Sequence, residues 1–229
     1  ILGFNIGRLS GVTLSSDFSL TNGSSLTVLN GLALNGSKLT VASTANITDL
    51  IFSGTQSVAG TGELVFGGTS VNGRIYAQST TDTLTLGSGV TVRANQGGSL
   101  GLSGRGLVNQ GTIIAQQGTN GTLTIDGANW SNQGSIQATS GILTTAGTWS
   151  STSAGSFSVA NGATLNLGGT FPTAALNIGT GKFVNAAGGA VNITGTLDNT
   201  GDILALDANT RGFNLASNGM VLNGEVQGS

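Results

Sequence analysis

The sequence has 229 residues, enough for one large domain or two small ones, and it carries only seven basic and nine acidic residues. It contains no histidine and no cysteine, so the usual general base, the commonest zinc ligand and thiolate chemistry are all missing. With a net charge of −2 and scattered basic residues, the chain has no electrostatic footprint for nucleic acid.

The composition predicts an all-β protein. The apolar residues, 38% of the chain, are mostly aliphatic and are interspersed with Thr, Ser, Asn and 40 glycines, against a single proline. β-Branched residues and Thr suit strands, whereas Gly and Asn suit tight corners. No run approaches 18 consecutive apolar residues, so we expect no membrane insertion of this segment. The chain starts without Met or a basic leader, and we expect it to be a segment of a longer protein.

Residues 1–88 form the less regular part of the chain. Strand-like runs occur at GSSLTVLNG (23–31), GSKLTVAS (36–43) and GELVFGG (62–68). We expect N-terminal solenoid turns in 1–88, and a separate small β domain there is the alternative. Residues 89–229 are expected to form regular repeats.

A three-part repeat begins at residue 89. The phrase NQGTIIA (109–115) returns as NQGSIQA (132–138), 23 residues later. The first segment recurs as GVTVRA (89–94), GTIIAQ (111–116), GSIQAT (134–139), GSFSVA (155–160), GKFVNA (181–186) and GDILAL (201–206). The second recurs as GSLGLSG (98–104), GTLTIDG (121–127), GILTTAG (141–147), GATLNLGG (162–169) and GAVNITG (189–195). The third is shorter and ends at Trp130, Trp149, Phe171 and Leu197.

This pattern predicts a right-handed parallel β-helix, or β-solenoid, with three short strands in each turn of about 20–27 residues. Apolar residues two apart, such as Leu123 and Ile125, place one face of each strand inward. The right-handed sense follows from the general preference of parallel crossovers.

Trp130, Trp149 and Phe171 occupy equivalent corners on successive turns. We interpret them as an aromatic stack that fills an interior corner. An exposed platform for sugar rings is the alternative, which makes the three residues candidate carbohydrate contacts. Asn109 and Asn132 recur two residues before the strand glycine, and Asn199 repeats this placement before Gly201; we expect an internal amide ladder at these positions.

The charged residues predict no catalytic, cofactor or metal site. Asp198, Asp202 and Asp207 form the only acidic cluster, and glycosidic hydrolysis needs two carboxylates at a set separation. We interpret the cluster as solvated turn residues.

The basic residues include one loose grouping, Arg74, Arg93 and Arg105. A scattered solvated face is the preferred interpretation, and contact with an anionic glycan is the alternative.

The runs DTLTLGSGVTVRA (82–94), NQGTIIAQQGTNGTLTIDGANWSNQGSIQA (109–138) and GATLNLGGTF (162–171) resemble the repeats of large bacterial surface adhesins. These include filamentous-haemagglutinin-like proteins and autotransporter passengers. The resemblance is clear over residues 82–210. It implies a parallel β-helix, export to the cell surface and a role as a stalk or adhesive rod.

We therefore expect a non-enzymatic structural or adhesive segment of a secreted bacterial surface protein. Its partners would be host or neighbouring-cell surfaces, including glycans, with no nucleic acid and no cofactor. A self-assembling filament or sheath subunit, which stacks end to end, is one alternative. A β-helix polysaccharide lyase or glycosidase is another.

Overall fold

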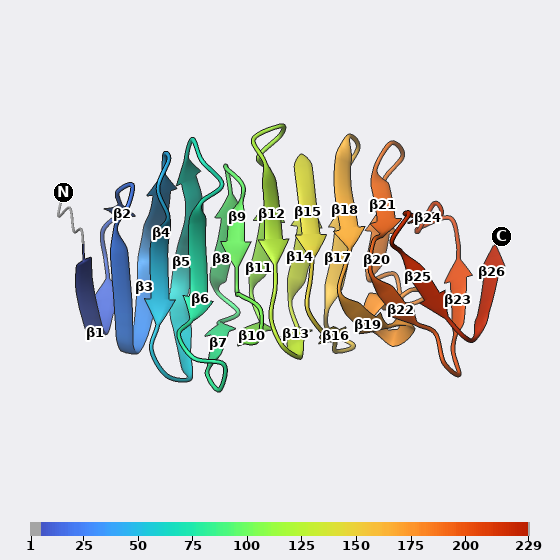
Figure 1. The fold of residues 1–229 in the computed structure, drawn as a ribbon, viewed down its shortest axis with the longest axis horizontal. Coiled ribbons are helices and arrows are strands. Elements are labelled where there is room, and N and C mark those ends of the chain that lie inside the picture. The colour runs from blue at the N-terminus through green and yellow to red at the C-terminus, as the bar shows by residue number, and fades with distance from the viewer. Residues whose placement is uncertain (1–5, 229) are drawn as a thin grey trace.

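The computed structural model describes residues 6–228 of the chain, and residues 1–5 and 229 lie outside the described part. The described chain is a parallel β-solenoid of about nine turns, which run in sequence order from one end of an elongated body to the other (Figure 1). Every strand pairing recorded in it is parallel, including those that link the first turns to the middle ones. The predicted fold class is confirmed.

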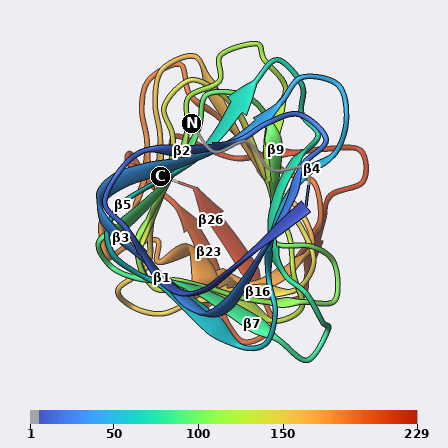
Figure 2. The same cartoon turned by 90° about the vertical axis from the view of Figure 1, so that its left-hand side faces the viewer.

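The turns have three sides, which we call faces A, B and C in the order in which the chain visits them. Seen from the N-terminal end, the chain passes from β4 and β9 on face A to β7 on face B and on to face C (Figure 2). This path is clockwise as the chain recedes, so the coil is right-handed.

Each face is a stack of short strands. Face A holds β4 (Thr48–Phe52), β6 (Gly73–Ala77), β9 (Gly98–Leu100), β12 (Thr122–Ile125), β15 (Gly141–Thr145), β18 (Ala163–Leu167), β21 (Ala190–Ile193) and β24 (Asn214–Leu215). Face B holds β7 (Thr83–Leu86), β10 (Gly106–Asn109), β13 (Trp130–Asn132), β16 (Trp149–Ser151), β19 (Thr170–Pro172), β22 (Thr196–Asp198) and β25 (Met220–Leu222). Face C holds β2 (Phe18–Leu20), β8 (Val90–Ala94), β11 (Thr112–Ala115), β14 (Ser135–Ala138), β17 (Ser156–Val159), β20 (Phe183–Asn185), β23 (Ile203–Leu206) and β26 (Glu225–Gly228).

Three long strands turn corners without a break: β1 (Ile6–Leu14), β3 (Ser25–Ser43) and β5 (Gln56–Gly68). Their pairings place β1 on faces A and B, β3 on all three faces, and β5 on faces B and C. One short 3₁₀ helix, η1 (Thr173–Leu176), follows β19 at the corner between faces B and C. The strands on either side of residue 88 share ladders, because β5 pairs with both β7 and β8.

The turns differ in length. Residues aligned on neighbouring turns are 19 apart at Trp130 and Trp149 and 28 apart at Gln56 and Leu84 (149 − 130 and 84 − 56). The variation is absorbed at the corners, since the strands themselves keep register. At the corner between faces A and B, Gly147 has a φ of +71° and its Cβ position is occupied by the carbonyl of Gly127 on the turn before. Glycine is needed there for both its backbone conformation and its close approach.

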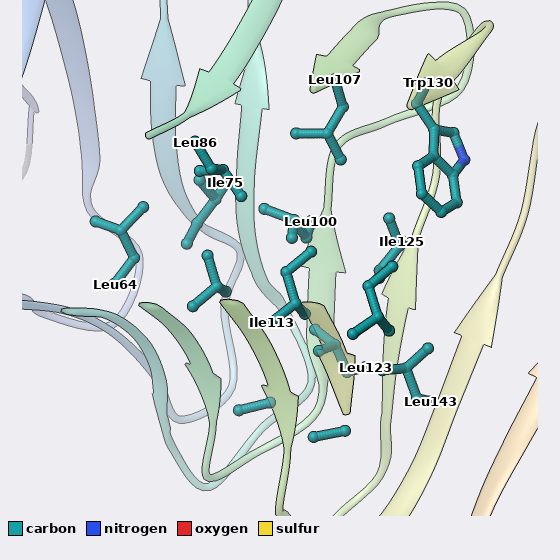
Figure 3. Close-up of a cluster of buried hydrophobic side chains, with 14 of the residues drawn as sticks. Leu64, Ile75, Leu86, Leu100, Leu107, Ile113, Leu123, Ile125, Trp130 and Leu143 are labelled. Atoms are coloured by element: carbon teal, nitrogen blue, oxygen red, sulfur yellow. The ribbon is translucent and has the colours of Figure 1, made fainter. Parts of the chain in front are cut away.

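The core is a set of inward columns that run the length of the solenoid. Burial alternates along strands such as β7, β11 and β12, whose second and fourth residues are buried. Figure 3 shows aliphatic side chains from successive turns pointing into one interior, with Trp130 beside them. One column on face C joins Leu64, Val92, Ile113, Ile136, Phe157 and Phe183.

Candidate functional site

The predicted aromatic corner is an interior stack. Trp130, Trp149 and Phe171 are 0%, 3% and 1% exposed. The ring centroids lie 5.3 Å apart between the two tryptophans and 4.4 Å apart between Trp149 and Phe171, with interplanar angles of 18° and 16°. Each indole N–H donates to a backbone carbonyl at 2.9 Å, Trp130 to Ala146 and Trp149 to Gly168. The rings have no exposed face on which a sugar could stack, so the alternative of an exposed platform for sugar rings is wrong for these three side chains.

A second aromatic column was not anticipated from the sequence. Phe157, Phe183 and Phe213 lie on successive turns, with centroid distances of 5.8 Å and 5.1 Å. Trp149 lies 5.8 Å from Phe157 and so joins the two columns. The available signal was the phenylalanine at the same place in GSFSVA and GKFVNA.

The predicted internal amide ladder is present at Asn109 and Asn132, both fully buried. Asn109 Nδ2 donates to Asn132 Oδ1 at 2.9 Å, and Asn132 Nδ2 donates to the Ser156 carbonyl at 3.3 Å. Asn199 is also buried, but its carboxamide oxygen accepts from the Thr173 hydroxyl at 2.7 Å. Asn109 Oδ1 has no hydrogen-bond partner among the described residues, but the other amide groups bond to corner backbone groups, to one another or to Thr173, so their role is structural.

The three arginines do not form one basic patch. Arg74 on face A makes a two-pronged pair with Asp49, at 2.6 and 2.7 Å, which raises the pKa of the guanidinium. Arg93 on face C pairs with Glu63 at 2.8 Å. Arg105 lies at the corner between faces A and B, with its guanidinium carbon 5.4 Å from the centre of the Tyr76 ring. Two of the three charges are neutralised on different faces, so the grouping expected for an anionic glycan is absent.

The acidic residues near the C-terminus organise turns. Asp198 Oδ1 accepts from the Thr200 amide at 3.1 Å and its hydroxyl at 2.6 Å, which lowers the pKa of the carboxyl. Asp207 Oδ1 accepts from the amides of Asn209 and Thr210. Within residues 6–228, no group of three or more acidic, His or Cys side chains is arranged to hold a metal ion.

A surface depression on face B is the candidate functional site. It has a volume of about 350 Å³ and spans four turns, from Asn129 through Thr148, Ser150 and Thr170 to Asp198. The remaining residues that line it are Trp149, Phe171 and Pro172. A larger hollow of about 570 Å³ is formed mainly by the loop after β23. The face B depression is walled largely by strand residues, which hold their side chains more rigidly than a loop does.

The sequence analysis singled out Trp149, Phe171 and Asp198, but it did not predict that the three residues line one depression. It missed Asn129, Ser150 and Thr170. The local sequence shows only that Thr148-Trp149-Ser150 and Thr170-Phe171-Pro172 alternate between outward and inward positions. The hollow itself could not be predicted, because it depends on how the turns stack.

Among residues 6–228, no helix is long and apolar enough to cross a membrane. No protein-family model, no curated protein and no solved structure matches the chain.

Proposed function

We propose that this chain is a non-enzymatic structural or adhesive segment of a secreted bacterial surface protein, acting as a stalk or binding rod. The observation that carries the proposal is the parallel ladder on face A, which runs without a break from β1 to β24. At roughly 4.8 Å per rung, nine turns make a body roughly 43 Å long in this segment alone. Neighbouring turns are joined by parallel strand pairing, so such a body resists bending. The repeats also resemble those of large surface adhesins.

The shape and assembly of the chain are tested with the purified 229-residue protein. Small-angle scattering combined with light scattering should give a monomeric, elongated particle whose length does not change with concentration. A particle that lengthens as concentration rises would support the filament subunit instead. A compact, nearly spherical particle would contradict the rod.

Location is tested on cells of the source bacterium. Antibodies raised against the purified chain should label intact cells, and brief external protease treatment should remove the label. Labelling only after permeabilisation would overturn the surface assignment. Adhesion is then measured as the retention of chain-coated beads on cell layers, with uncoated beads as the control.

The absence of enzymatic activity is tested with a panel of neutral and acidic polysaccharides. Prolonged incubation should release no new reducing ends and no unsaturated products. Release of either, if it persists through purification, would establish a glycosidase or a lyase.

A further inference from the structure

The face B depression contains hydrogen-bonding groups that the protein leaves unused. Within the described residues, the Ser150 and Thr170 hydroxyls make no hydrogen bond, and Asn129 uses its carboxamide oxygen but not its Nδ2. Asp198 Oδ1 accepts from Thr200, and Oδ2 has no hydrogen-bond partner among residues 6–228. The hollow thus offers one amide donor, two hydroxyls that both donate and accept, and one carboxylate acceptor.

The charges around the depression select against anions. The sequence has no charged residue between Asp126 and Lys182, so the neighbouring turns on face B are neutral. Among the described residues that line the hollow, Asp198 is the one that carries a charge, and none is a lysine or an arginine. The hydrogen bonds from Thr200 lower the pKa of the Asp198 carboxyl, which favours the ionised form. A carboxylate forms strong hydrogen bonds with hydroxyl donors but repels carboxylate, sulfate and phosphate groups.

Three apolar residues line the depression beside its polar groups. Pro172 is exposed, whereas Trp149 and Phe171 line the hollow beside it with almost no exposed surface. A volume of about 350 Å³ lies at the lower end of the range of ligand sites. The depression extends across four turns, or roughly 14 Å at the spacing of parallel rungs.

We propose that the face B depression binds an uncharged oligosaccharide. Sugar hydroxyls would donate to Asp198 Oδ2, accept from Asn129 Nδ2 and exchange hydrogen bonds with Ser150 and Thr170. The C–H face of a ring would lie on Pro172. The inference rests on the proposed adhesive role, for which it supplies a ligand class and a site.

A glycan array that carries both neutral and acidic oligosaccharides tests the site directly with the purified chain. We expect retention of one or more neutral glycans, with an affinity at least tenfold higher than that for uronic-acid or sulfated glycans of similar length. Titration calorimetry with the retained glycan gives its Kd. Retention of acidic glycans alone, or of none, would overturn the proposal.

Two variants locate the binding. Thr170→Trp fills the depression from an exposed strand position, and Asp198→Ala removes the free acceptor. Each should weaken binding of the retained glycan at least tenfold. The matched control is Val184→Trp on β20, a 44% exposed outward position on face C, which should bind like the parent chain.

Circular dichroism and thermal melting establish that each variant is folded. Equal binding by Thr170→Trp and Val184→Trp would place the ligand elsewhere and refute the site. Bead adhesion measured on the same proteins keeps the two proposals apart. A chain that adheres to cells but binds no neutral glycan disproves the site alone, whereas glycan binding without surface labelling disproves the surface role alone.

Discussion

Trp149 combines packing and hydrogen bonding in one buried side chain. Its ring stacks between Trp130 and Phe171 and also contacts Phe157. Its indole N–H donates to the Gly168 carbonyl on the next turn. The residue therefore ties three turns together, and a substitution there affects all of them.

We expect Trp149→Ala to lower the free energy of unfolding by about 3–5 kcal/mol, because it leaves a cavity inside the aromatic stack. Trp149→Phe should cost less, since it keeps a ring in the stack. Chemical denaturation followed by circular dichroism measures both. The neighbouring exposed residue gives the control: Ser150→Ala should change stability by about 0.5 kcal/mol or less. Similar losses of unfolding free energy for Ser150→Ala and Trp149→Ala would contradict the placement of Trp149 in a buried aromatic stack.

Tyr76 is the one tyrosine of the chain and is 8% exposed. Burial raises the pKa of its phenol above the ordinary value of 10.0, and the nearby Asp49 carboxylate adds to this effect. A raised folded-state pKa favours the neutral phenol in the folded protein. Its contribution to stability is therefore complete below pH 10 and is lost as the pH rises through the folded-state pKa.

The absorbance of tyrosinate near 295 nm reports this single group. We expect the folded chain to titrate at a higher pH than the chain in denaturant, which should titrate near 10.0. In Tyr76→Phe, stability should fall less steeply above pH 10 than in the parent. Identical titration of the folded and unfolded chains would show that the phenol is not buried.

At the scale of elements, two asparagine ladders run along the solenoid, one inside and one outside. Asn109 and Asn132 are fully buried between faces, where an unpaired amide is costly. Asn166, Asn192 and Asn214 form an outward ladder on face A, with amide hydrogen bonds of 2.9 and 3.1 Å. Water can replace the outer bonds but cannot reach the inner ones.

Asn132→Ala should lower the free energy of unfolding by about 1–3 kcal/mol, because Asn109 Nδ2 would lose its buried acceptor. Asn166→Ala removes a similar group from the outer ladder and should cost about 0.5 kcal/mol or less. Denaturant titration of both variants gives the comparison. A larger loss of unfolding free energy for Asn166→Ala than for Asn132→Ala would contradict the assignment of Asn132 to the buried ladder and Asn166 to the outer one.

For the whole molecule, the core of each turn is closed by the turns next to it. Ile193 on β21 and Leu215 on β24 occupy the same inward column. Ile193, which has a described turn on both sides, is 3% exposed, whereas Leu215 on the last described turn of face A is 60% exposed. Burying a side chain of this kind contributes about 1.5–3 kcal/mol, but ordering each residue costs about 1–2 kcal/mol. Stacking is therefore what makes a turn stable.

Removal of one complete turn should leave a folded, shorter solenoid. Leu143 aligns with Leu165, so the period here is 22 residues (165 − 143), and deletion of 141–162 brings Ala163 into the register of Gly141. Scattering should show a particle shorter by about 4.8 Å. Deletion of 141–151 removes half a turn, breaks the register and should abolish the cooperative melt. A cooperative melt in the half-turn deletion would contradict the registered stack.

The sequence by itself determined the strands and their inward faces. Alternating aliphatic residues with Gly and Asn at the corners specify short strands locally, as at Leu123 and Ile125, and the repeated phrase specifies the stacking. The alignment of Trp130 with Trp149 was likewise readable from their places in the repeat.

The tertiary structure alone decided which outward residues meet. Asp49 and Arg74 lie 25 residues apart and Glu63 and Arg93 lie 30 apart, because turns of unequal length set the register between neighbours. The hollow on face B has the same origin. It forms where short outward side chains from four turns coincide, and no single stretch of sequence contains that coincidence.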